Sequence, residues 1–243
     1  MKVMAYERIP VVTAQGLSDN RSYIAAGDLC ILEEKTPSGL YPVTYPTAKG
    51  KKTRYLKSLK GFLVNQNHFA GLPYTAPGYP KATIKSSGCG VCAAVMVVGA
   101  LQGKHLPVRA MRDLALSCGA RVSGGTDMKL LTAELCRRYD LRCQLSNDVQ
   151  ALENHLKAGG VAICNTAGRG MFSTGGHYVV ALGLLDECVC IADPGLYDGK
   201  YNTPRRRKVV TVEGELLLAH KSVLDDDCVG RWPRYYLLEA VKK

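Results

Sequence analysis

Three residues of this chain, Cys89, His177 and Asp193, have the chemistry of a nucleophile, a general base and an orienting acid. Cys89 follows a Ser-Ser-Gly approach and opens a long apolar stretch, which predicts a buried helix with the sulfur at its N-terminus. Unpaired N–H groups and the macrodipole at that end favour a thiolate, the nucleophilic form, over a thiol. Taken alone, the same pattern fits a structural cysteine equally well.

His177 begins a predicted strand after the glycine-rich loop GRGMFSTGG. We therefore expect its ring at a sheet edge beside mobile backbone, a place that suits a general base. Asp193 lies in the turn Ala-Asp-Pro-Gly at the end of the next predicted strand, where a carboxylate can orient an imidazole and stabilise its charge. The two strands are predicted to form a hairpin with its loop at Asp186-Glu187, which makes 177 and 193 cross-strand neighbours.

The elements that must position these residues divide the chain in two. Residues 1–62 are predicted to form a separate all-β module, because short β-type runs recur there without a helical period. The runs are RIPVVTA, GDLCILEE, LYPVTYP and KTRYLKS. The following stretch NQNHFAGLPYTAPGYPK has no period and is expected to be a linker or a surface loop laid over a site.

Residues 63–243 are predicted to form an α+β domain in which helices precede an antiparallel sheet. Helices are predicted at CGVCAAVMVVGAL, VRAMRDLALSCG, TDMKLLTAELCRRY and VQALENHLKAGG. Thr126 is expected to cap the third helix, and the glycine pair that ends KAGG is expected to terminate the fourth. Strands are predicted at VAICNTA, HYVVALGLL, CVCIADP, RKVVTV and RYYLLEAV.

Several of these segments resemble bacterial papain-superfamily cysteine peptidases related to the bacteriocin-processing (double-glycine leader) family. The similarity in order and spacing covers about residues 63–200. It is carried by SSGCGVCAAVM, GGTDMKLLTAELCRRYDL, the helix ending in KAGG, FSTGGHYVVALGL and IADPG. The resemblance implies a papain-like fold in which Cys89 is the nucleophile, His177 the base and Asp193 the orienting acid.

The same resemblance implies an oxyanion-hole glutamine upstream of the nucleophile. Near relatives place it six positions before the cysteine, where this chain has Thr83. Gln66 is the only glutamine in the right region, so it is the candidate, although a long Pro/Gly-rich insertion separates it from Cys89. The chain also has Val91-Cys92 where the family has Pro-Thr, and these positions belong to the helix rather than to the acid–base relay.

Residues 1–62 resemble bacterial SH3-like domains that bind cell-wall material, and YPVTYPTAKGKKTRYL is similar to their final strands. A binding module tethered to a hydrolase raises its effective concentration on a polymeric substrate. The two resemblances together imply an endolysin-like enzyme that cleaves amide bonds in peptidoglycan peptides. The alternative is a cytosolic or leader-peptide cysteine peptidase that acts on protein substrates.

The charge balance of the 243-residue chain, 32 Lys and Arg against 21 Asp and Glu, favours polyanionic partners such as an anionic cell-wall polymer. The basic clusters at 49–54 and 205–208 lack a recognition helix, a zinc finger or a basic-aromatic signature, so no nucleic acid is expected. No apolar run approaches the ~20 residues of a membrane span, and the N-terminal residues MKVMAYERIPVV are not expected to act as a secretory signal. We expect synthesis in the cytoplasm and action on the wall after release, or a cytoplasmic location for the alternative peptidase.

The ten cysteines are expected to be reduced and mostly buried, because most lie in apolar runs of a long chain without a signal. Cys89 and Cys92 could instead form a thioredoxin-like redox site, but the preceding residues 82–87 are mostly polar rather than an apolar strand. A zinc site would combine these two with Cys188 and Cys190, whose single-residue spacing is atypical. No metal or cofactor is expected, and a non-catalytic wall-binding or adaptor protein remains an alternative.

Overall fold

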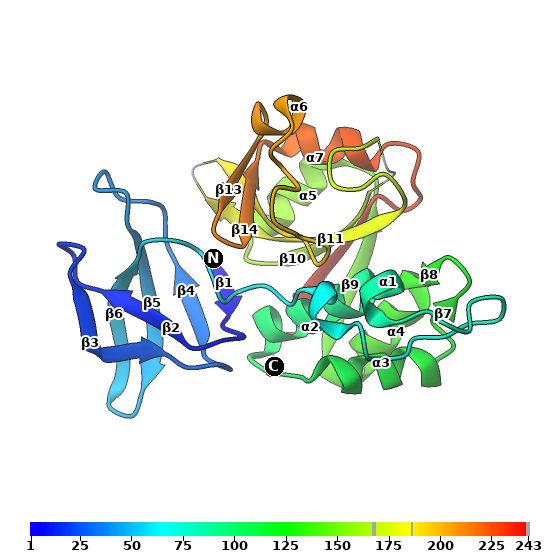
Figure 1. Ribbon diagram of the computed structural model, residues 1–243, viewed down its shortest axis with the longest axis horizontal. Coiled ribbons are helices and arrows are strands. Elements are labelled where there is room, and N and C mark those ends of the chain that lie inside the picture. Colours follow the sequence, from blue (N-terminus) through cyan, green and yellow to red (C-terminus); the bar gives the residue numbers. More distant parts are fainter. Residues whose placement is uncertain (167–168, 186, 242–243) are drawn as a thin grey trace.

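The computed structural model describes residues 1–166, 169–185 and 187–241. It is a mixed α+β structure with two large sheets, both antiparallel, and the predicted α+β class is therefore confirmed. In Figure 1 the N-terminal sheet lies at the left, helices α1 to α4 at the lower right, and α5, α6 and α7 at the top. No helix in the described ranges has the length and apolarity needed to cross a bilayer.

The N-terminal sheet has six strands in the order β1-β4-β5-β6-β2-β3. They are β1 (Lys2–Met4), β2 (Ile9–Val12), β3 (Ser18–Ile24), β4 (Leu29–Leu32), β5 (Tyr41–Thr47) and β6 (Gly50–Leu56). The four predicted β-type runs contain β2 and β4 and overlap most of β5 and β6. The sequence did not predict β1, which is short, or β3, in which mostly polar residues face solvent.

The N-terminal sheet packs directly on the rest of the chain. The Tyr6 hydroxyl lies 3.4 Å from the Val95 carbonyl oxygen, and Glu215 accepts a 2.8 Å hydrogen bond from the Gly61 N–H. One continuous buried hydrophobic cluster includes Val3 of the sheet and Val97 of the helical region. The described contacts therefore hold the sheet against the helices through a shared core.

The helical elements cover the middle of the chain and one later region. They are η1 (Gln66–Phe69), α1 (Ile84–Ser87), α2 (Cys89–Gln102), α3 (Val108–Ser117), α4 (Met128–Tyr139), α5 (Val149–Lys157), α6 (Pro204–Arg207) and α7 (Lys221–Cys228). Helix α2 is apolar on all sides and is buried along most of its length, as expected of a central core helix. Gly159, directly after the end of α5, has a φ of 86° and ends that helix as predicted.

The predicted cap of the third long helix is wrong. Asp127, rather than Thr126, is the N-cap of α4, because its carboxylate accepts hydrogen bonds from the N–H groups of Lys129 at 2.9 Å and Leu130 at 3.2 Å. A side chain reaches these donors only from the position just before the first turn. The Thr126 hydroxyl instead bonds with the Tyr74 hydroxyl at 2.9 Å.

The second large sheet has seven strands in the order β13-β14-β12-β11-β10-β15-β9. They are β9 (Leu141–Ser146), β10 (Val161–Thr166), β11 (His177–Leu185), β12 (Cys188–Ala192), β13 (Val210–Glu213), β14 (Leu216–Ala219) and β15 (Tyr235–Ala240). A two-stranded ribbon, β7 (Arg121–Val122) with β8 (Gly125–Thr126), completes the strands of the described residues.

The predicted order of helices first and strands afterwards is too simple. Strand β9 lies between α4 and α5 in the chain and pairs with β15, and α7 follows β14. Neither β9 nor β14 was predicted. The residues of β9 do alternate, since polar side chains separate Leu141, Cys143 and Leu145, but the run is short and only Leu141 is buried at this edge of the sheet.

The predicted hairpin that carries the candidate base is present. Strands β11 and β12 are antiparallel, with Leu185 paired to Cys188 and Val180 paired to Ala192. Of the predicted loop, Asp186 lies outside the described residues. Helix α2 packs against one face of this sheet and α5 and α7 against the other, so β11 is covered on both sides.

The irregular stretch between η1 and α1 lies on the surface of the helical region. The buried Tyr74 anchors it, since its carbonyl accepts a 2.7 Å hydrogen bond from the Arg121 side chain. The carbonyl of Pro73 accepts another from Arg112 at 2.8 Å. Of the two predictions for this stretch, the surface loop is the one that the described contacts support.

Candidate active site

Cys89 is the first residue of α2, and Gly88 joins α2 to the preceding helix α1. A side-chain carbon at Gly88 would lie 2.6 Å from the carbonyl oxygen of Ile84, so only glycine fits between α1 and α2. Gly88 is also the N-cap of α2 and has no side chain with which to cap the first N–H groups. Cys89, a half-buried residue, therefore lies at an uncapped helix N-terminus, as predicted.

His177 and Asp193 contact each other directly. Nε2 of His177 lies 2.7 Å from Oδ1 of Asp193. The pairing of Val180 with Ala192 makes the two residues diagonal neighbours on one face of the hairpin rather than direct cross-strand partners. The loop before His177 is anchored, since the buried Asp227 accepts hydrogen bonds from the N–H groups of Met171 at 3.3 Å and Phe172 at 3.2 Å.

Asp193 is completely buried and accepts four hydrogen bonds. Oδ1 accepts from His177 and, at 2.8 Å, from the Gly195 N–H. Oδ2 accepts from Nζ of Lys200 at 2.6 Å and from the hydroxyl of Tyr201 at 2.6 Å. Both carboxylate oxygens are thus fully engaged, which fixes the rotamer that faces the imidazole.

Lys200 and Tyr201 are site residues that sequence reasoning missed. Lys200 is a buried lysine whose only charged neighbour within hydrogen-bond distance among the described residues is Asp193. Both residues lie in the loop after the aspartate turn, within LYDGKYNT, which has neither a motif nor a periodicity. Only the path of that loop back over Asp193 reveals their role.

The three candidate residues shift one another's pKa values so that the charged form of each is favoured. The pKa values of Asp193 and Cys89 are lowered, and that of His177 is raised. Burial favours neutral Asp193, but the hydrogen bond and charge of His177, together with the Lys200 ammonium, lower the pKa of the carboxyl far below its usual range. Burial also opposes protonation of His177, but the hydrogen bonds and charges of Asp193 and Cys89 outweigh it and raise the pKa to about 9.

Cys89 is the third charged member. Burial alone would raise the pKa of its thiol, but the hydrogen bond and charge of His177 and the backbone N–H groups of Tyr178 and Gly90 lower it below the ordinary value. Nε2 of His177 is engaged by Asp193, so Nδ1 is the nitrogen that faces the sulfur. The arrangement is a thiolate–imidazolium pair supported by a buried carboxylate.

Gln66, the candidate oxyanion residue, lies between the aspartate turn and the approach to the nucleophile. Its backbone N–H donates to the Pro194 carbonyl at 2.8 Å, and its Nε2 donates to the Lys85 carbonyl at 2.7 Å. Lys85 belongs to α1, the short helix that leads into Cys89. Thr83, six positions before the nucleophile, is the N-cap of α1. The place of Gln66 fits the oxyanion role, which stays a prediction.

The structure disfavours the competing uses of the cysteines. Burial, and then the charge of Cys89, raise the pKa of the Cys92 thiol well above its usual range, so this residue is a poor partner for dithiol exchange. None of the ten cysteines, all of which lie within the described residues, forms a disulfide. Within residues 1–166, 169–185 and 187–241, no group of three or more His, Cys, Asp or Glu side chains is arranged to hold a metal ion.

The charged pair predicts a pH profile that needs no knowledge of the substrate. The reactive form requires Cys89 ionised and His177 protonated, so reactivity should rise with pH as the thiol ionises and fall above about pH 9 as the imidazolium loses its proton. The measurement is the pH dependence of kcat/KM for amide hydrolysis, once a substrate is in hand. Without a substrate, the rate at which iodoacetamide alkylates Cys89 reports the acid limb of the profile. The rate measured with Cys89→Ala is subtracted to remove the contribution of the other thiols. An alkaline limb near pH 6.5, the ordinary value for histidine, would contradict the pairing with Asp193.

Comparison of the chain with protein-family models, with curated proteins and with solved structures finds no match.

Proposed function

We propose that this chain is a cysteine hydrolase that cleaves amide bonds in the peptides of bacterial peptidoglycan. The observation that supports this most strongly is the 2.7 Å contact of His177 with the buried Asp193, together with Cys89 at a helix N-terminus, whose pKa His177 lowers. A buried carboxylate held by four donors, with an imidazole between it and a thiol, is costly to build, since each buried charge must be paired. Such arrangements are concentrated at catalytic sites.

The proposed reaction proceeds through a thioester. The Cys89 thiolate attacks the amide carbonyl carbon, and the electron pair of the C=O bond moves to the oxygen. Collapse of this tetrahedral intermediate breaks the C–N bond, and the His177 imidazolium gives its proton to the leaving amine. The neutral His177 then takes a proton from water, whose hydroxide attacks the thioester and releases the carboxylic acid and the thiolate.

The developing oxyanion is assigned to two N–H donors, one at the start of α2 and one on Gln66 of η1. The Cys89 backbone N–H lies in the first turn of that helix, where N–H groups have no intrahelical acceptor. Nε2 of Gln66 carries a second hydrogen besides the one that it donates to Lys85. Two fixed donors of this kind stabilise charge that develops only in the transition state.

Asp193 acts in this proposal by holding His177 rather than by accepting its proton. Its lowered pKa keeps the carboxylate ionised, so it fixes the Nε2–H tautomer and leaves Nδ1 free for the sulfur. Lys200 and Tyr201 hold the other carboxylate oxygen. The papain-like fold of residues 63–243 and the family resemblance of about residues 63–200 belong to this proposal.

In the proposed architecture, residues 1–62 form an SH3-like module that docks the enzyme on the wall. A surface hollow of about 430 Å³ on this sheet is lined by tyrosines and basic residues, a combination that suits an anionic polymer. Its side chains include Arg21, Tyr23, Tyr45, Lys49, Lys51 and Lys52. An anionic wall polymer is therefore the proposed partner of this module.

The proposed function is tested by digestion of purified cell walls. Walls from several Gram-positive species are incubated with the wild type, Cys89→Ala and Cys92→Ala, and new peptide termini are identified by mass spectrometry. We expect fragments with the wild type and with Cys92→Ala and none with Cys89→Ala. Walls that yield no Cys89-dependent fragment would overturn the wall hydrolase and leave a peptidase with protein substrates. Equal loss in Cys92→Ala would favour dithiol chemistry.

A further inference from the structure

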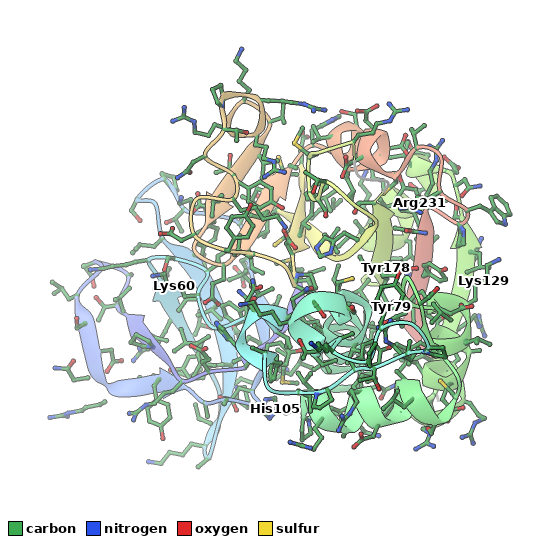
Figure 2. The ribbon with its side chains drawn as sticks, turned by 45° about the vertical axis from the view of Figure 1, so that its right-hand side comes forward. Lys60, Tyr79, His105, Lys129, Tyr178 and Arg231 are labelled. Carbon is green, nitrogen blue, oxygen red and sulfur yellow. The ribbon has the colours of Figure 1, made fainter. Side chains whose placement is uncertain are left out.

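Arg231 lies in the connection between α7 and β15, against the backbone that leads into the candidate base. A side-chain carbon at Gly176 would lie 2.5 Å from Nη2 of Arg231 and 3.5 Å from its Cζ. Gly176 directly precedes His177, so the guanidinium packs on the entry to β11. Figure 2 shows Arg231 above Tyr178, where the large sheet meets the helices.

The backbone that carries Arg231 is fixed on both sides. The Arg231 N–H donates to the Cys228 carbonyl at 3.2 Å, at the end of α7. Three residues later, the Arg234 N–H donates to the Asn147 side chain at 2.9 Å, and its guanidinium pairs with Asp225 at 2.8 Å. The guanidinium of Arg231 is thus presented from a preorganised segment, which lowers the entropy cost of binding a ligand.

The guanidinium of Arg231 has no acidic or carbonyl partner within hydrogen-bond distance among the described residues, and its Nε atom is buried without a hydrogen bond. Neighbouring arginines are satisfied, since Arg234 pairs with Asp225 and Arg169 with Asp226. A half-buried, unpaired guanidinium is unfavourable. A planar carboxylate would satisfy it with two parallel charge-assisted hydrogen bonds.

Arg231 shares its surroundings with the nucleophile. Burial, followed by the negative charge at Cys89, raises the pKa of Tyr178 to about 12, and the positive charge of Arg231 opposes this rise. The same Tyr178 directly follows His177, and its backbone N–H is among the groups that lower the pKa of Cys89. Tyr178 therefore lies within reach of both charges. Asp127, the N-cap of α4, is the acidic group that also acts on this phenol.

We propose that Arg231 binds a carboxylate of the substrate close to the scissile amide, which makes the enzyme selective for peptides that carry a free carboxylate there. This inference rests on the proposed hydrolase, because it assigns the substrate of the same site. It narrows the substrate class to peptides that carry a free carboxylate near the amide that Cys89 attacks.

The first test uses iodoacetate and iodoacetamide, two alkylating reagents that differ in a carboxylate and an amide. The Cys89 thiolate displaces iodide from either, so their rate ratio measures the preference for the carboxylate. We expect Arg231→Gln to lower this ratio by about 3- to 30-fold through the lost charge, and Arg231→Lys to retain part of it. The control Arg109→Gln removes an exposed positive charge from α3 and should leave the ratio unchanged. An unchanged ratio in Arg231→Gln would overturn the proposal.

The second test compares wall peptides with a free or an amidated carboxyl group beside the scissile bond. The wild type should cleave the acid form about 10- to 100-fold faster, and Arg231→Gln should abolish this difference by slowing cleavage of the acid form. Slower cleavage of both forms would reveal a merely structural role.

Binding can be followed separately from cleavage. The only tryptophan, Trp232, directly follows Arg231 in the chain and is 72% exposed. We expect its fluorescence to change when a peptide binds to Cys89→Ala.

The two proposals fail in different ways. An Arg231-dependent iodoacetate preference without cleavage of any wall would retain the carboxylate site and overturn the wall hydrolase. Cleavage of walls with an iodoacetate preference that is independent of Arg231 would retain the hydrolase and overturn the carboxylate site.

Discussion

Replacement of His177 by glutamine, His177→Gln, is expected to lower amide hydrolysis by about 10²- to 10⁴-fold, because it removes the general base and acid of the relay. The variant also loses the hydrogen bond and charge that lower the pKa of Cys89, while burial continues to raise it. The thiol should then be mostly protonated at neutral pH. Alkylation of Cys89 by iodoacetamide at pH 7 should slow by at least about tenfold.

A matched control separates this effect from a general loss of histidine. His68→Gln makes the same change at an exposed position of η1 and should leave both hydrolysis and alkylation unchanged. Circular dichroism checks that His177→Gln remains folded. Alkylation of Cys89 at the wild-type rate in this variant would contradict the thiolate–imidazolium pair, whatever the substrate of the enzyme is.

Asp193→Asn is expected to lower the free energy of unfolding by about 3–5 kcal/mol, because it leaves the buried Lys200 ammonium without its counter-charge. The asparagine NH₂ cannot accept from His177 or Lys200, which both donate to Asp193. The pKa of His177 should fall from about 9, since Asp193 is the main group that raises it. Denaturant unfolding measures the first effect, and the alkaline limb of the pH profile measures the second.

A second substitution distinguishes the buried charge from a general packing defect. Combining Asp193→Asn with Lys200→Met removes both charges and should recover part of the lost stability, but it should not recover hydrolysis. The control Asp113→Asn affects a carboxylate that is 57% exposed and paired with Arg112, and it should change stability by no more than about 0.5 kcal/mol. Stability losses that are similar at Asp193 and Asp113 would contradict the proposed role of the buried pair.

The elements that carry the candidate site could be predicted because their signals are local. The apolar stretch after Cys89 is long enough for only one outcome, a buried helix, and α2 begins at the predicted residue. The hairpin of β11 and β12 follows from two adjacent apolar runs with a short connection, and it brings His177 to Asp193. Short-range chain geometry decides both features, so the sequence alone is sufficient for them.

Other features depend on parts of the chain that are distant in sequence. Strand β9 is a short edge strand, and its hydrogen-bond partners come from β15, almost a hundred residues later in the chain. Thr126 and Asp127 are both residue types that cap helices, and helix propensity does not decide which of two adjacent residues is the N-cap of α4. Such choices are made by packing rather than by local pattern.

The sequence by itself determined which residue types were available for chemistry and where in the local structure Cys89, His177 and Asp193 would lie. Only the tertiary structure decided what surrounds them: Lys200 folded back onto Asp193, and Arg231 without a partner beside the entry to His177. The physical reason is that a side chain's electrostatic role depends on distances through space. These distances join loops that no motif links and no periodicity relates.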